Sequence, residues 1–191
     1  VPLQIEANFS QDKFLNLPRD NWRLSNQVAP VGPLTATGIH LVDLSVSFLG
    51  KPRSVAARLT SRGAGFENGD TLAIFLEFES GAVSLMSAIL ATPFDGRFAI
   101  YGSKGWAEIR DRTHPENPTG WDVTKTLRGE AQEKEFFEPH QAVLANLNAF
   151  ALAVRGVAPY PIHSAEKLYT VGALEAIMRA VLSNKVEPIT L

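Results

Sequence analysis

The sequence contains no cysteine. A thiol nucleophile, a thiolate metal site and a disulfide framework are therefore excluded. No apolar run approaches the roughly 18 residues that a membrane-spanning helix needs, and the first residues lack the basic region of a signal peptide. Lys and Arg number 18 against 20 Asp and Glu, without a basic cluster, which argues against nucleic acid as the main partner. We expect a cytoplasmic protein with no membrane partner and no nucleic-acid partner.

What is present is the composition of an ordinary globular protein, with 45% hydrophobic and 20% charged residues in a chain of 191. Such a chain can bury a substantial core, and its length suits a single domain. Residues 3–9 alternate between apolar and polar side chains, as a half-buried strand does. An irregular segment follows at residues 10–33. Apolar residues then recur at helical spacing over residues 34–49, and Gly50 ends this helix.

The remainder of the chain predicts a run of strands followed by two helices. Strands joined by hairpins form antiparallel sheets, and the helices that follow them pack on one face. The sequence thus predicts an α+β fold, an open and mostly antiparallel sheet with helices packed on one face. We expect Leu168, Val171 and Leu174 to belong to the buried stripe of the last helix. The expected strands are residues 54–61, 71–79, 82–92, 97–102, 106–110, 121–127 and 133–137, and the expected helices are residues 140–155 and 164–184.

Two of the expected strands are apolar on both faces. Residues 72–76 and 85–90 place apolar side chains in both alternating sets, which is more than one buried face requires. Helices cover one face, so the other face needs a partner, and we expect a homo-oligomer that forms through the open sheet face. The alternative is a sandwich-like fold in which the chain covers its own sheet.

The helix expected at residues 34–49 carries a polar stripe. Its members, at positions i, i+4, i+7 and i+11 on one side of the helix, are Ala36, His40, Asp43 and Ser47. An imidazole with a carboxylate three residues further on can be oriented by hydrogen bonding, as a general acid/base requires. The alternative is a buried His40 that Asp43 holds for packing alone.

Five segments of the chain together resemble one protein family. Residues 21–23 (Asn-Trp-Arg), followed by residues 38–43 (Gly-x-His-x-x-Asp), match its central signature. Residues 98–106 are similar to its strand–Gly–x–x–Gly–strand hairpin. Residues 5–9 resemble the first strand of the same domain, and residues 164–184 resemble its last helix. With these segments in this order, essentially the whole chain resembles the C-terminal domain of the Gfo/Idh/MocA oxidoreductases.

This resemblance implies a division of labour between two domains. In the family an N-terminal Rossmann domain binds NAD or NADP, and residues 1–191 correspond to the second domain, which binds substrate and forms the dimer. The Rossmann domain is absent from this sequence, so we expect no cofactor on this chain alone and no activity without that domain. The whole protein is expected to be an NAD(P)-dependent dehydrogenase acting on a sugar, polyol or related carbohydrate.

The family's functional residues carry over to the matching positions of this chain. His40 is the expected acid/base or hydrogen-bond donor at the substrate hydroxyl, and Asp43 is the catalytic residue expected to orient it. Trp22, Arg23 and Thr37 are the expected substrate-binding residues. The remaining histidines are scattered without ligand spacing, so no metal site is expected.

Three features depart from the family pattern. Ala36 stands where many members have an Asp one helical turn before the histidine, and residues 31–33 read Val-Gly-Pro in place of three glycines. The family's Glu-Lys-Pro motif and a Gly-x-Gly-x-x-Gly between a strand and a helix are absent from this sequence. The Gly-rich residues 63–69 lie between two strands, so they are no phosphate cradle. A non-catalytic scaffold or dimerisation domain therefore remains the alternative function. The substrate's identity depends on two loops, residues 12–29 and 111–120, which we expect to shape the pocket.

Overall fold

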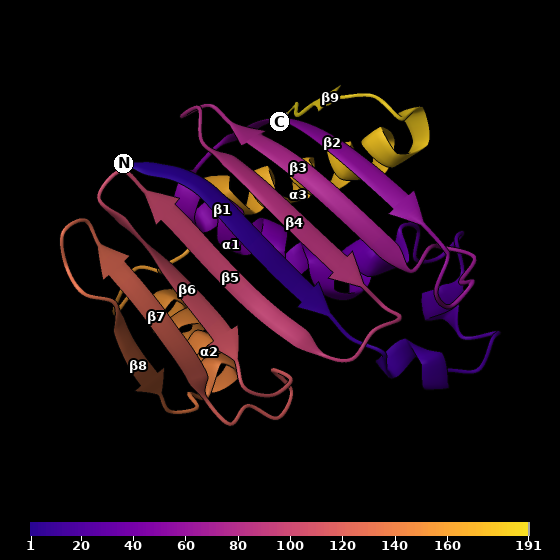
Figure 1. Ribbon diagram of the computed structural model, residues 1–191. Coiled ribbons are helices and arrows are strands. Elements are labelled where there is room, and N and C mark those ends of the chain that lie inside the picture. The colour runs from indigo at the N-terminus through magenta and orange to yellow at the C-terminus, as the bar shows by residue number, and fades with distance from the viewer. Residues whose placement is uncertain (191) are drawn as a thin grey trace.

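The computed structural model describes residues 1–190. They form one sheet of nine strands, together with three longer helices (Figure 1). In chain order the strands are β1 (Pro2–Ser10), β2 (Pro52–Thr60), β3 (Thr71–Phe78), β4 (Val83–Ile89), β5 (Asp95–Gly102), β6 (Gly105–Asp111), β7 (Trp121–Leu127), β8 (Glu133–Phe137) and β9 (Glu187–Pro188). The helices are α1 (Ile39–Leu49), α2 (Ala142–Val154) and α3 (Ser164–Ser183).

The N-terminal strand β1 lies inside the sheet, whose order is β8-β7-β6-β5-β1-β4-β3-β2-β9. β1 runs parallel to β4, with Ile5 opposite Ser84, and antiparallel to β5. Every other pair of neighbouring strands in residues 1–190 is antiparallel. The predicted α+β class with an open, mostly antiparallel sheet is confirmed. The sequence did not predict the parallel pair, because alternation identifies a strand and not its neighbour.

Helices α1 and α3 lie together on one face of the sheet, behind it in Figure 1. Val42 and Val46 of α1 and Ile177 of α3 are at most 1% exposed, and they share one core with Leu72 and Leu76 of β3. Removing each such side chain from water contributes roughly 1.5–3 kcal/mol. This core fixes α1 on the sheet, so the position of the helix's first turn is set by packing.

The face that α3 buries differs from the predicted one. Ala173 and Ala176 are fully buried, whereas Leu168 and Val171 are 64% and 53% exposed. Small side chains let the helix approach the sheet and α1 closely, so the alanines occupy the contact. The prediction of a buried stripe is therefore wrong for Leu168 and Val171, while Leu174 packs at the margin of the core.

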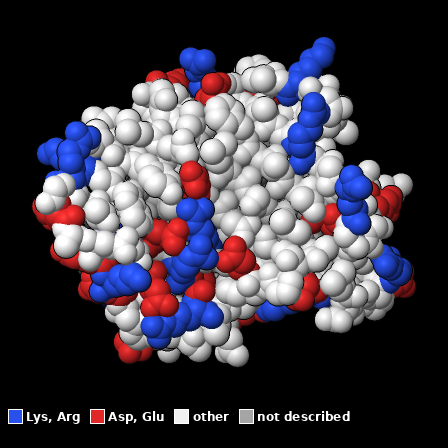
Figure 2. Space-filling model, viewed as in Figure 1, with Lys and Arg blue, Asp and Glu red and all other residues white. Residues whose placement is uncertain are grey.

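The sheet face opposite these helices is left open by residues 1–190. Phe75 and Leu85 lie on it and are 38% and 40% exposed. A charged group occupies its centre, where the Arg97 guanidinium bonds to Glu108 at 2.6 Å and to Glu6 at 3.3 Å. Figure 2 shows this face, with charged side chains gathered in the middle and uncharged surface around them. The sandwich-like alternative is therefore excluded for the part of the chain that the structure describes.

Helix α2 presents apolar side chains to solvent. No residue of α2 is buried, and Val143, Leu147 and Phe150 are all more than half exposed. The helix is tied to the segment before α3 by Tyr160, whose ring packs edge-on against Phe150 at 6.0 Å and whose hydroxyl donates to Asn146. Among the helices of residues 1–190, none combines the length and the apolar character needed to cross a membrane.

Candidate functional site

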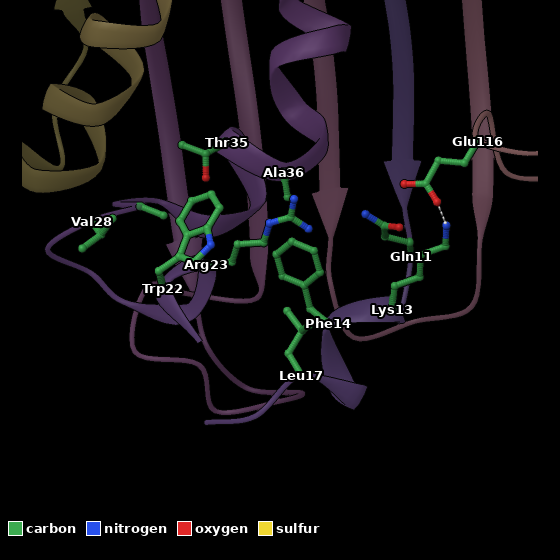
Figure 3. A pocket seen from close by; sticks show the side chains of 11 residues that line it. Gln11, Lys13, Phe14, Leu17, Trp22, Arg23, Val28, Thr35, Ala36 and Glu116 are labelled. Carbon is green, nitrogen blue, oxygen red and sulfur yellow. Dashed lines mark hydrogen bonds and ion pairs between the residues drawn. The ribbon is translucent and has the colours of Figure 1, made fainter. Parts of the chain in front are cut away.

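A cavity of about 380 Å³ opens beside the end of β1 and the start of the helical segment that leads into α1 (Figure 3). Its volume lies in the range of small-molecule sites, roughly 300–1,000 Å³. Two short 3₁₀ helices, Lys13–Asn16 and Trp22–Leu24, supply one part of its wall. The lining residues are Gln11, Lys13, Phe14, Leu17, Trp22, Arg23, Val28, Ala29, Thr35, Ala36 and Glu116.

A buried asparagine holds the wall of this cavity in place. The side-chain amide of Asn68 donates to the carbonyl oxygens of Arg23 and Ala29, both at 2.7 Å, and the Asn68 backbone carbonyl accepts from the Gly32 N–H at 2.7 Å. A Cβ on Gly32 would lie 2.8 Å from the Asn68 side chain, so this position requires glycine. Asn68 thus fixes the loop that carries Trp22 and Arg23.

The segment before α1 is a π-helical turn, Leu34–Gly38. The Ile39 N–H donates to the Leu34 carbonyl five residues back, which widens the backbone at the point where Ala36 faces the cavity. Such turns occur often at functional sites. Gly38 is buried, and a Cβ there would meet the Pro33 carbonyl at 3.3 Å and Ala88 of β4 at 3.8 Å. The glycine therefore serves close packing of the turn on the sheet.

Arg23 is held between two aromatic rings at the cavity. Its guanidinium carbon lies 5.3 Å from the Trp22 ring centroid and 5.8 Å from that of Phe14. In Figure 3 the guanidinium lies above Phe14 and below Ala36, in the middle of the lining residues. Within residues 1–190 it has no hydrogen-bond or ion-pair partner. Stacking orients the charge while leaving its N–H donors free.

A polar cluster closes the other end of the cavity. Lys13 pairs with the Glu116 carboxylate, and the Lys13 ammonium also lies 3.1 Å from His114 Nδ1. The Glu116 N–H donates to the same nitrogen at 3.2 Å, so Nδ1 is an acceptor and the His114 Nε2–H donates to Gln11 at 2.9 Å. Burial, together with the Lys13 charge, lowers the pKa of His114. The ring is therefore neutral at pH 7, and the hydrogen bond to Lys13 lowers the pKa of Glu116.

His40 lies on the first turn of α1, about one helical turn after Ala36 and so roughly 5 Å further along the axis. Its ring is exposed and packs beside Phe9 with 6.0 Å between centroids, and Phe9 in turn lies 5.7 Å from the His114 ring. His40 is near the cavity wall without being part of it. The Asp43 carboxylate accepts from the Thr170 hydroxyl at 3.0 Å and makes no bond to His40 in the described residues.

Two of the three residues predicted to contact substrate line the cavity, and the third does not. Trp22 and Arg23 both line the cavity. Thr37 is fully buried, and its hydroxyl donates to the Pro33 carbonyl at 3.3 Å. Its side chain therefore stabilises the π-helical turn. The role of Thr37 toward a substrate, like those of Trp22 and Arg23, stays a prediction.

Several lining residues were not singled out from the sequence. Gln11, Lys13 and Phe14 follow β1, and Glu116 lies in a loop 103 positions after Lys13. No spacing rule connects residues so far apart in the chain. Both loops expected to shape the substrate pocket, residues 12–29 and 111–120, contribute to this wall, and their role toward a substrate stays a prediction.

The Gly-rich loop between β2 and β3 is closed to a phosphate. The Asp70 carboxylate accepts backbone N–H bonds from Gly63 at 2.9 Å, Ala64 at 2.6 Å and Gly65 at 3.3 Å. Burial alone would raise the pKa of Asp70, but the bonds from Ala64, Thr71, Gly63 and Gly65 outweigh it and hold that pKa below its usual value. The amides that could cradle a pyrophosphate are therefore occupied.

No group of three or more His, Asp or Glu side chains within residues 1–190 converges to form a metal site.

Comparison with protein families matches this chain to a known domain. The model of the GFO/IDH/MocA C-terminal domain matches residues 1–108, which is more than half of the chain. No curated protein gives a significant match.

Solved structures share the fold over nearly the whole chain. An oxidoreductase from Desulfitobacterium hafniense, assigned as NADPH-dependent, has a TM-score of 0.87 and 22% identity over 98% of this chain and 57% of its own. The aldose-aldose oxidoreductase of Caulobacter crescentus, complexed with glycerol, has a TM-score of 0.81 and 20% identity over 98% and 55%. Levoglucosan dehydrogenase, in complex with NADH, has a TM-score of 0.77 and 15% identity over 99% and 59%. The chain thus spans less than two thirds of each of these proteins.

Proposed function

The chain belongs to the GFO/IDH/MocA family as its C-terminal domain, and on that basis we propose that it is the substrate-binding and oligomerisation domain of an NAD(P)-dependent oxidoreductase acting on a sugar or polyol. The observation that carries the proposal is the cavity of about 380 Å³, which joins aromatic and charged side chains beside the helix that bears His40. The structural neighbours include an enzyme complexed with glycerol and one complexed with NADH and levoglucosan.

In this proposal His40 handles the proton of the reacting hydroxyl. A secondary alcohol loses a proton from oxygen and a hydride from carbon when it is oxidised; a bound nicotinamide would supply the hydride acceptor, and His40 would take the proton. His40 is exposed and adjoins the cavity wall through the helical turn that carries Ala36, so a substrate reaching out of the cavity comes within range of the imidazole. The family's Asp is replaced by Ala36, and Asp43 is bonded to Thr170, so the ring acts without a carboxylate partner from residues 1–190.

The dinucleotide itself is assigned to a separate nucleotide-binding domain. The Gly-rich loop is no phosphate cradle, because Asp70 occupies its amides. Helix α2 supports the presence of a second domain, since Val143, Leu147 and Phe150 are exposed on it. A helix whose apolar residues find no partner gains little from packing, which is the main source of helix stability in proteins. We propose that the nucleotide-binding domain covers this surface and that this chain alone is inactive.

The open sheet face is proposed as the oligomer interface. Phe75 and Leu85 supply apolar contact area, and Arg97 with Glu6 and Glu108 supplies charges that can fix the register of two copies. A self-complementary face of this kind suits a two-fold dimer. The proposal also places the protein in the cytoplasm, because a dehydrogenase depends on the cell's nicotinamide pool.

The test uses the full-length protein and a panel of sugars and polyols with NAD and NADP. We expect His40→Ala to lower turnover by roughly 10²–10⁴-fold, the usual effect of removing a general acid/base. His140→Ala is the matched control, because His140 is exposed and lies just before α2. Unchanged turnover in His40→Ala would remove the acid/base assignment. A full-length protein that forms the dimer but turns over no member of the panel would favour the second candidate, a scaffold domain.

A further inference from the structure

Among residues 1–190, the cavity contains one cation that has no hydrogen-bond or ion-pair partner. Lys13 is neutralised by Glu116, and His114 is neutral because its Nδ1 is an acceptor. Two cations and one carboxylate line the cavity, so one positive charge remains, and it belongs to Arg23. In the described residues this guanidinium has no hydrogen-bond partner, although it is held in place between the rings of Trp22 and Phe14.

A positioned guanidinium with free donors is suited to one kind of ligand group. Its fork of N–H donors matches a carboxylate in a bidentate pair, and such charge-assisted pairs are about twice as strong as neutral hydrogen bonds. A neutral sugar offers hydroxyls, which do not need a stacked cation. The exposed Arg23 guanidinium lies beside the rings of Trp22 and Phe14, and these contacts reduce the ordering that binding requires.

We propose that the cavity binds a hydroxylated carboxylate, that is, a sugar acid, with its carboxylate on Arg23. This inference rests on the proposed function and names the substrate class of the same cavity. The single net charge of the lining matches a monoanion. A phosphate ester carries up to two negative charges, one more than the net charge of the lining compensates, which disfavours it.

The polar cluster at the other end of the cavity receives the hydroxyl groups. Gln11 and the Lys13–Glu116 pair together provide donors and acceptors, and Figure 3 shows them on the side of the cavity away from Trp22. A sugar acid bound between Arg23 and this cluster lies under Ala36. Its hydroxyl-bearing carbons then face the helix on which His40 follows one turn later.

The experiment measures selectivity in the full-length protein. Galacturonate is the sugar-acid probe, galactose is its neutral counterpart and galactose 6-phosphate is the phosphate probe. We expect the ratio of kcat/KM for galacturonate to that for galactose to fall about 10- to 100-fold in Arg23→Gln, the effect of losing a charge-assisted pair. Arg23→Lys, which keeps the charge but loses the fork, should lose less. Arg19→Gln is the control, because Arg19 lies over Phe66 outside the cavity and should leave the ratio unchanged.

Equilibrium binding of galacturonate by calorimetry separates this inference from the proposed function. Binding that is lost in Arg23→Gln but kept in Arg19→Gln supports the inference even where no turnover occurs, in which case the oxidoreductase proposal alone fails. An unchanged ratio and unchanged binding in Arg23→Gln overturn the inference and leave the oxidoreductase proposal standing. Tighter binding of the phosphate than of galacturonate also overturns it.

Discussion

Asp43 on α1 accepts a hydrogen bond from the Thr170 hydroxyl on α3 at 3.0 Å. The bond ties together the two helices that cover the sheet. The sequence predicted that the same carboxylate orients His40, three residues earlier on the same helix. Because no bond between Asp43 and His40 is present in residues 1–190, the carboxylate's visible role is to fix one helix against the other.

This relationship predicts a stability effect for Asp43. We expect Asp43→Ala and Thr170→Val each to lower the free energy of unfolding by about 1 kcal/mol, the usual net value of one hydrogen bond. The double variant should lose little more than either single one, because both remove the same bond. Urea unfolding of the four proteins measures this coupling. Additive losses would contradict the shared bond, and a shift of the pH profile of turnover in Asp43→Ala would restore Asp43 to the role of orienting His40.

Asp70 organises the loop between β2 and β3, so its charge should matter to stability. In the folded protein its pKa lies below the ordinary value, because the backbone N–H bonds of Ala64 and Gly63 outweigh the cost of burial. Its contribution is therefore complete above the unfolded pKa, near 3.9, and is lost as pH falls through the folded pKa. We expect Asp70→Asn to lower the free energy of unfolding at pH 7 by about 2–3 kcal/mol. The exposed Asp12→Asn is the control, and equal losses in the two variants would contradict the role of the loop.

His114 should make the fold sensitive to mild acid. Burial lowers its pKa in the folded protein, so between the folded value and the unfolded value near 6.5 the unfolded chain binds more protons. The contribution of neutral His114 to the free energy of unfolding is therefore fully present above pH 6.5, and it is lost as the pH falls through the folded pKa. We expect His114→Gln to flatten the dependence of the unfolding free energy on pH between about 7 and 5. Denaturant unfolding at several pH values measures this, and an unchanged slope in His114→Gln would count against it.

His163→Gln serves as the control for this measurement. His163 is exposed at the N-terminal end of α3 and makes no side-chain capping bond. Its replacement should leave the wild-type slope intact, whereas a slope that flattens in both variants would assign the acid sensitivity to histidines in general.

The helices and strands could be predicted from the sequence because each has a local period. Residues 121–127 and 133–137 coincide with β7 and β8, and the helix expected at residues 34–49 was found as a π-helical turn followed by α1. The buried face of α3 could not be predicted from hydrophobicity. Large side chains such as Leu168 score higher than alanine, but close contact with the sheet selects for small ones such as Ala176.

The candidate site was harder to predict than the fold, because its lining residues lie far apart in the sequence. Trp22 and Arg23 were predicted as substrate contacts and line the cavity. Lys13 and Glu116 meet only because β1 is inserted beside β5, and this insertion depends on a pairing that neither strand encodes alone. The neutral state of His114 likewise depends on neighbours contributed by two separate loops.

The altered turn before the π-helix has a measurable consequence. Val31 stands where the family pattern has the first of three glycines, and its φ of 54° is in the left-handed region. A β-branched residue rarely adopts this conformation, which costs on the order of 1 kcal/mol. The side chain is 4% exposed and packs in the main core. Burial of the valine thus offsets the backbone strain at the edge of the cavity wall.

Strain and burial at Val31 can be separated with two substitutions. Val31→Ala and Val31→Gly both remove the buried methyl groups, but only glycine also relieves the strained φ. We expect Val31→Gly to be more stable than Val31→Ala by about 1 kcal/mol in urea unfolding. Val42 is equally buried in the interior of α1, and there the order should reverse, with Val42→Gly less stable than Val42→Ala by about 1 kcal/mol. The same order at both sites would mean that the backbone at Val31 relaxes without cost, and that the departure from glycine stores no strain beside the cavity.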